Sequence, residues 1–177
     1  MKRQTIAVIA PGDMGSGVGQ ALSRGGHDVV TSLTGRSVES RTRAERHGFR
    51  DLVDLDIVVR EASLILSILP PAAAVALATD VSAAMERSGV RPVYMDCNAI
   101  SPDNSRRIAR IMEAAGAAYI DCGIIGLAPG KGPQPTRLYV SGPDLAPADA
   151  LAVEGISLKG VGLEIGRASA LKMLYSG

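Results

Sequence analysis

The sequence is poor in aromatic residues and lacks an excess of charge of either sign. Phe, Trp and Tyr make up only 3% of the 177 residues, and tryptophan is absent. Single-stranded nucleic acids bind largely by stacking their bases on aromatic side chains, so this composition argues against such a partner. The 19 basic and 18 acidic residues leave a net charge of +1 without a block of like charge. This balance gives no electrostatic footprint for nucleic acid or an anionic membrane.

The sequence also lacks long apolar runs and contains only two cysteines. No apolar stretch reaches the roughly 18 residues that would span a bilayer, and no basic signal peptide precedes the first predicted strand. Cys97 and Cys122 are not spaced like metal ligands, and two cysteines give little support to a disulfide framework. We therefore expect a reduced, cytoplasmic protein without a metal site.

Buried strands and amphipathic helices alternate along the whole chain. The apolar run at residues 6–10, followed by a glycine cluster, predicts a buried parallel strand. This rhythm predicts an α/β fold with a doubly wound, mostly parallel sheet of the Rossmann type, which binds ligands beyond the carboxyl ends of its strands. Further strands are expected at 28–31, 49–52, 64–69, 92–96, 118–122 and 137–141, with a weak one at 162–165; helices are expected at 15–25, 37–48, 71–87, 101–116, 146–153 and from 168.

A glycine turn joins the first predicted strand to the first helix, in the segment AVIAPGDMGSGVGQAL (residues 7–22). In a dinucleotide-binding turn, glycines let the backbone approach the pyrophosphate and let the helix pack closely on the strand. Gly12 and Gly15 fit these two roles. We predict that the pyrophosphate rests on the helix N-terminus, on amides near Asp13, Met14 and Gly15. The alternative is a glycine turn that binds nothing.

The segment after the second strand predicts the choice of cofactor. An acidic residue there would hold the ribose 2′-hydroxyl of NAD, whereas an arginine would accept the 2′-phosphate of NADP. The chain has no acid between Asp28 and Glu39, but it has Arg36 and Ser37 at a predicted helix start. This pattern favours NADP over NAD. The alternative is that Arg36 is a solvated charge.

Several segments follow one another in the order and spacing of a known family. They are the glycine turn, GGHDV (25–29), the Arg36-Ser37 pair, SILP (67–70) and DCNAISP (96–102). They resemble the β-hydroxyacid dehydrogenase group, which is related to 6-phosphogluconate dehydrogenase. CNAISP (97–102), GIIG (123–126) and ASALKM (168–173) look more narrowly like the branch labelled 6-phosphogluconate dehydrogenase-like. The resemblance covers essentially the whole chain.

The resemblance implies how the chain is divided. Residues 1–166 would form the NADP-binding domain, and residues 167–177 would begin the interdomain helix. Family members continue into an all-helical domain that closes over the substrate and usually forms the dimer; here that domain would be absent. The chain would then be a fragment or a natural truncation that binds cofactor but turns over little, whereas the full-length parent would be a homodimer.

The resemblance also assigns roles to single residues. Leu69 and Pro70 would pass along the cofactor, and Asn98 would approach the nicotinamide ribose or the substrate. Lys172 matches the catalytic lysine, which can exchange a proton with the substrate oxygen while hydride moves to or from the nicotinamide. Ser176 replaces an asparagine four residues later, on the same helix face.

These features predict an NADP-binding domain of an oxidoreductase that acts on a small hydroxy acid or related alcohol by hydride transfer. One departure from the pattern of the family that it resembles leaves the substrate open. Ile125 stands where that family has a serine that helps to hold the substrate carboxylate. The alternatives are a non-catalytic NADP-binding or sensor module, an imine reductase-like enzyme and a methyltransferase. Arg36 argues against the methyltransferase, which would want an acid after the second strand.

Overall fold

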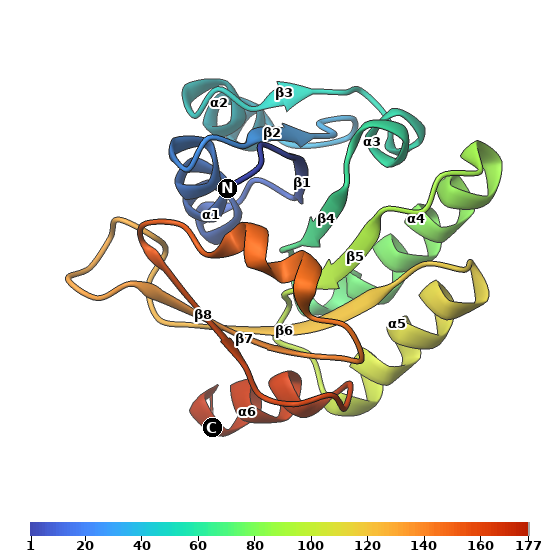
Figure 1. Cartoon of the computed structure of the whole chain (residues 1–177). Coiled ribbons are helices and arrows are strands. Elements are labelled where there is room, and N and C mark those ends of the chain that lie inside the picture. Colours follow the sequence, from blue (N-terminus) through green and yellow to red (C-terminus); the bar gives the residue numbers. More distant parts are fainter. Residues whose placement is uncertain (177) are drawn as a thin grey trace.

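Eight strands form one sheet in the computed structural model, which describes residues 1–176 (Figure 1). The strand order is β3-β2-β1-β4-β5-β6-β7-β8, and every neighbouring pair is parallel except β6 and β7. The strands are β1 (Thr5–Ile9), β2 (Asp28–Thr31), β3 (Arg50–Asp51), β4 (Leu64–Ser67), β5 (Val93–Asp96), β6 (Tyr119–Ile125), β7 (Thr136–Ser141) and β8 (Ile156–Gly160).

Helices cover both faces of the sheet and bury a core against each (Figure 1). Along β1, Ile6 and Val8 belong to one core, whereas Ala7 and Ile9 belong to the other. A strand buried on both faces reads as a continuous apolar run, which is why this strand could be predicted. On the first face lie α1 (Asp13–Arg24), α2 (Val38–Arg46) and η2 (Ala146–Leu151); on the second lie α3 (Leu55–Glu61), η1 (Pro71–Ala73), α4 (Ala74–Ser88) and α5 (Pro102–Ala114). The predicted doubly wound, mostly parallel sheet is confirmed.

Side-chain caps explain where several of the helices begin. Ser37, Asp54 and Ser101 each accept a hydrogen bond from the backbone N–H three residues further on. Such caps satisfy amides that have no partner within the helix. Helix α4 ends at Gly89, which adopts φ 73°, the left-handed conformation in which helices commonly stop.

The last third of the chain departs from the predicted elements. The strand expected at 162–165 is wrong, because the strand in this region is β8, which pairs in parallel with β7. Gly162 (φ 133°) and Gly166 (φ 97°) interrupt regular structure at the expected position. The helix expected at 146–153 is the short 3₁₀ helix η2, and α3 had no counterpart among the predicted helices.

The final helix, α6 (Arg167–Ser176), begins at the predicted domain boundary and contacts β6, β7 and α5. The division into residues 1–166 and 167–177 stays a prediction, and Gly177 lies outside the described residues. Within residues 1–176, the structure contains no helix with the length and apolar character needed to cross a membrane.

Candidate functional site

The predicted site residues follow four strands that are neighbours in the sheet. Gly12 comes after β1, Arg36 after β2, Leu69 after β4 and Asn98 after β5. Because β2, β1, β4 and β5 are parallel and adjacent, their carboxyl ends meet at one edge. The structure therefore brings these segments together where a doubly wound sheet binds ligands.

The glycine turn leaves the start of α1 open. Gly12 is the N-cap of α1, and no side chain caps the helix there. A Cβ atom added to Gly12 would meet nothing within 4 Å, whereas one added to Gly15 would lie 2.3 Å from the Ala10 carbonyl oxygen. Gly15 thus permits the close approach of helix and strand, and Gly12 keeps the space before the helix clear. The first-turn amides can receive an anion in that space.

An ion pair not anticipated from the sequence joins this turn to a distant loop. Lys131 lies in the segment 128–135, which crosses α1, and its Nζ donates to a carboxylate oxygen of Asp13. This hydrogen bond lowers the pKa of Asp13 below its ordinary value. A Cβ on Gly17 would lie 2.9 Å from the Ala128 Cβ, so the loop also packs tightly on the helix. Lys131 therefore compensates the one carboxylate that stands at the start of α1.

The loop after β2 presents an arginine with an unengaged guanidinium. Arg36 is half-buried, and its side chain makes no hydrogen bond or ion pair within residues 1–176. The Ser37 hydroxyl caps α2 by accepting from the Ser40 amide at 3.2 Å. The acid at the end of neighbouring β3, Asp51, accepts from the amides of Leu33 (3.1 Å) and Val53 (2.9 Å). The geometry thus offers Arg36 to a ligand and uses Asp51 to shape the loop.

Asn98 is directed into the protein. Its side chain is almost fully buried, and Oδ1 accepts from the Leu69 amide at 2.7 Å. Its Nδ2 donates to the Ser67 hydroxyl (2.8 Å) and to Asp96 (3.1 Å), which uses both amide hydrogens. In this structure Asn98 positions the loop that carries Leu69 and the exposed Pro70. Its direct contact with a ligand stays a prediction.

Four buried polar residues form a row across the sheet below this edge. Ser67, Asp96, Asp121 and Ser141 are register partners on β4, β5, β6 and β7, and all four are fully buried. Burial raises the pKa of Asp96 from its ordinary value of 3.8 to about 6, although hydrogen bonds from Asn98 oppose this effect. The sequence alone does not indicate this row, because its members are aligned by the register of four strands.

Asp121 fixes the start of α6. Its carboxylate accepts from the Gly166 amide (3.0 Å), the Ser169 amide (2.9 Å) and the Ser169 hydroxyl (2.5 Å). The Ser141 hydroxyl also donates to it, at 3.2 Å. These bonds satisfy amides at the start of α6 and attach the helix to β6.

Lys172 lies on α6 directly against β6. A Cβ on Gly123 would lie 3.0 Å from the Lys172 Cβ, so the absence of a side chain at Gly123 allows this contact. The last pair in the β5–β6 register is Asp96 with Asp121, so Gly123 lies on β6 two residues beyond that pair. The structure therefore places Lys172 beside β6, just beyond its last pair with β5. Its approach to Asn98 and a substrate stays a prediction. Ser176 is exposed at the end of the helix.

The two cysteines come directly after Asp96 and Asp121, which are register partners on β5 and β6. Both are buried in the same core. Hydrogen bonding to Cys122, together with burial, raises the pKa of the Cys97 thiol well above its ordinary value. A thiol held protonated in this way is a poor nucleophile.

The chain is similar to known proteins both in sequence and in fold. Residues 5–152 match the family described as the NAD binding domain of 6-phosphogluconate dehydrogenase. Among solved structures, a conserved protein of unknown function with structural similarity to 3-hydroxyacid dehydrogenases is 30% identical to the chain. It superimposes with a TM-score of 0.84 and covers 97% of the chain, which in turn covers 63% of that protein.

Two further solved structures share the fold at lower identity. The 3-hydroxyisobutyrate dehydrogenase of Mycobacterium tuberculosis, solved with L-serine, is 22% identical with a TM-score of 0.79. An imine reductase variant from Myxococcus stipitatus, in complex with NAD⁺, is 18% identical with a TM-score of 0.80. They cover 98% and 99% of the chain, which spans 59% and 60% of their lengths. The chain thus spans less than two thirds of each of these structures.

Proposed function

The chain belongs to the family of the NAD binding domain of 6-phosphogluconate dehydrogenase, and from this premise we propose that it is the NADP-binding part of a hydride-transferring oxidoreductase. The observation that carries the proposal is the uncapped start of α1, which stands open behind Gly12 at the edge that also presents Arg36. Both features suit a phosphate-rich dinucleotide.

Different residues would hold different parts of the cofactor. The amides of Asp13, Met14 and Gly15 would hold the pyrophosphate, because the helix start supplies N–H donors and a positive dipole end. Arg36 would grip the 2′-phosphate with its planar fork, which is the reason to prefer NADP. Ser37 lies beside this position, but its hydroxyl is engaged as a cap, so Arg36 carries most of the preference.

Leu69, Pro70 and Asn98 would line the path from the pyrophosphate to the reacting end. Leu69 is half-buried and held at its amide by Asn98, so the loop offers a fixed apolar surface. When bound, the nicotinamide supplies or accepts the hydride. Lys172 would donate a proton to the substrate oxygen during reduction, or take one from the hydroxyl during oxidation. Ser176, one helical turn further on, would hydrogen-bond to the same substrate.

The proposed substrate is a small hydroxy acid or related alcohol, and the proposed assembly of the full-length parent is a homodimer in the cytoplasm. Imine reduction is the second candidate, since an imine reductase shares the fold and Ile125 offers no hydroxyl to a carboxylate. Assays of the full-length parent with hydroxy acids and with cyclic imines separate the two. If the first candidate is right, the parent oxidises hydroxy acids and Lys172→Ala abolishes this oxidation. If the second is right, imine reduction survives Lys172→Ala.

Calorimetric titration of the chain with NADP and NAD tests the cofactor assignment. We expect NADP to bind at least about tenfold more tightly, and Arg36→Ala to remove that preference while leaving NAD affinity within about twofold. Arg110→Ala, which removes an exposed arginine from α5, is the matched control. Absence of binding by either dinucleotide would overturn the proposal and leave a scaffold or a different ligand.

A further inference from the structure

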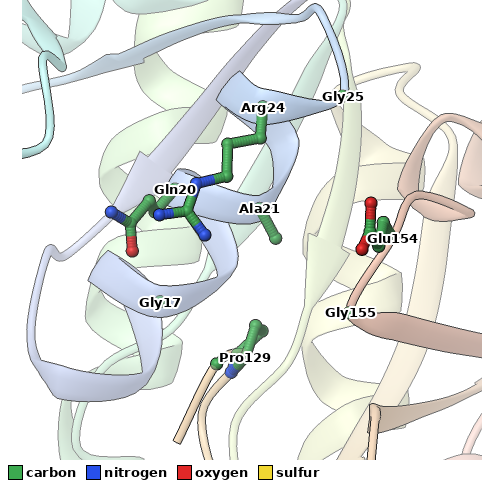
Figure 2. Close-up of a pocket in the computed structure, with 9 residues that line it drawn as sticks. Gly17, Gln20, Ala21, Arg24, Gly25, Pro129, Glu154 and Gly155 are labelled. Atoms are coloured by element: carbon green, nitrogen blue, oxygen red, sulfur yellow. The ribbon is translucent and has the colours of Figure 1, made fainter.

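A cavity lies between α1, α2 and the segment 128–135, and it meets the proposed cofactor site only at the start of α1. It has a volume of about 460 Å³, and of the proposed cofactor-binding residues only Asp13 lines it. It adjoins a smaller cavity of about 250 Å³ that lies between α1 and the segment of Glu154 and Gly155 (Figure 2). Gln20, Arg24 and Pro129 line both cavities. We call the larger one the α1–α2 cleft.

Positive charge dominates the α1–α2 cleft. Arg24, Arg43, Arg46 and Lys131 line it, together with the single carboxylate of Asp13. Lys131 pairs with Asp13, and Arg43 pairs with Glu39 at 2.6 Å. The side chains of Arg24 and Arg46 form no ion pair or hydrogen bond within residues 1–176, so no carboxylate of the cleft pairs with their two charges.

The shape of the cleft supports a ligand in addition to its charge. Figure 2 shows the Arg24 side chain extending along α1 toward Gln20, whereas Glu154 lies across the smaller cavity. Arg24 is thereby directed toward a residue that also lines the cleft. His47, at the end of α2, lines the cleft too.

We propose that the α1–α2 cleft binds the phosphate group of a small anionic ligand at a site distinct from the dinucleotide site. Arginine forks match phosphate oxygens and form strong charge-assisted hydrogen bonds, so Arg24 and Arg46 would hold the anion from two helices. The wall formed by segment 128–135 is fixed by its close contact with Gly17 and by the Lys131–Asp13 ion pair. The site therefore exists before the ligand arrives.

The test is calorimetric titration with inorganic phosphate and with glycerol phosphate, at constant ionic strength and with NADP present in excess. We expect the double variant Arg24→Gln/Arg46→Gln to weaken binding by about tenfold or more. The control Arg41→Gln removes an exposed charge of α2 that does not line the cleft, and it should change the affinity by less than about twofold. Tighter binding of glycerol phosphate identifies a phosphate ester as the ligand, and tighter binding of phosphate identifies the free ion.

Three results would overturn the proposal: no binding below about 10 mM, equal weakening by the control variant, or phosphate binding that appears only when NADP is omitted. The last result would place the phosphate in the cofactor site. Arg24 and Arg46 are exposed, so their replacement removes no core contact, and circular dichroism checks that the variant is folded. If the chain does not bind NADP, the loss of phosphate affinity in Arg24→Gln/Arg46→Gln still reports on the cleft, so the two proposals fail separately.

Discussion

Two glycines in the same turn serve different purposes, and substitution separates them. We expect Gly15→Ala to destabilise the fold by about 1–3 kcal/mol, because its Cβ would lie 2.3 Å from the Ala10 carbonyl oxygen. Gly12→Ala should leave stability within about 1 kcal/mol yet weaken NADP binding, since its methyl group would enter the space before α1. Urea denaturation followed by circular dichroism, with cofactor titration, measures both effects. Equal stability of the two variants would contradict this interpretation.

The Asp13–Lys131 ion pair makes a prediction about cofactor affinity. In Lys131→Ala, the Asp13 carboxylate would stand uncompensated near the proposed pyrophosphate position, and NADP affinity should fall by about three- to tenfold at low salt. Adding Asp13→Asn to this variant should restore most of the loss, because the repelling charge is then gone. A double-mutant cycle of NADP titrations measures the coupling. A double variant as weak as Lys131→Ala would instead indicate that Lys131 contacts the cofactor itself.

Asp96 predicts a specific dependence of stability on pH. Its folded pKa of about 6 exceeds its ordinary value of 3.8, so the folded state retains the proton more strongly than the unfolded state. The resulting stabilisation is fully present below about pH 4 and is lost as pH rises through 6, a change of about 3 kcal/mol. Urea unfolding measures the free energy of unfolding of the chain and of Asp96→Asn across this range. The value for the chain minus the value for the variant should fall as pH rises. Asp80→Asn, at an exposed position on α4, is the control, and a difference that stays flat with pH would contradict the assignment.

At the scale of elements, α6 depends on one buried carboxylate. Asp121→Asn keeps the shape of the side chain but replaces an acceptor by a donor, which cannot serve the amides of Gly166 and Ser169 and the Ser141 hydroxyl together. We expect a loss of about 2–4 kcal/mol and faster hydrogen exchange in α6, with β1 protected until global unfolding. Ser169→Ala, which removes a single hydroxyl donor, should cost about 1 kcal/mol. Uniform exchange throughout the sheet would show that α6 is not anchored in this way.

Elements with a local signal could be predicted from the sequence, and contacts between distant segments could not. Residues within a few positions of one another indicate the buried run of β1, the helix start at Ser37 and the glycine turn. By contrast, the Asp13–Lys131 pair joins residues 118 positions apart, and the polar row through Asp96 and Asp121 depends on register. Asn98 follows β5, at the end of a strand that the sequence predicted, but its inward direction follows from partners on β4 and β5.

At the scale of the whole molecule, cofactor binding should stabilise every part that unfolds with the sheet. The proposed contacts come from loops after β1, β2, β4 and β5, which are neighbours in one cooperative core, so a bound dinucleotide opposes the unfolding of all of them. At an NADP concentration about 100 times Kd, linkage gives about 2.7 kcal/mol. For a chain of this size, that corresponds to a rise in Tm of roughly 5–10 °C.

Thermal unfolding followed by circular dichroism checks this rise, with NAD and Arg36→Ala as comparisons at matched concentrations. NADP should lose most of its effect on Arg36→Ala, whereas NAD should act similarly on both proteins, because only NADP carries the 2′-phosphate that Arg36 would grip. Phosphate bound in the α1–α2 cleft would add a further rise that survives Arg36→Ala and disappears in Arg24→Gln/Arg46→Gln. An NADP effect as large on Arg36→Ala as on the unchanged chain would move the determinant of cofactor choice away from the end of β2.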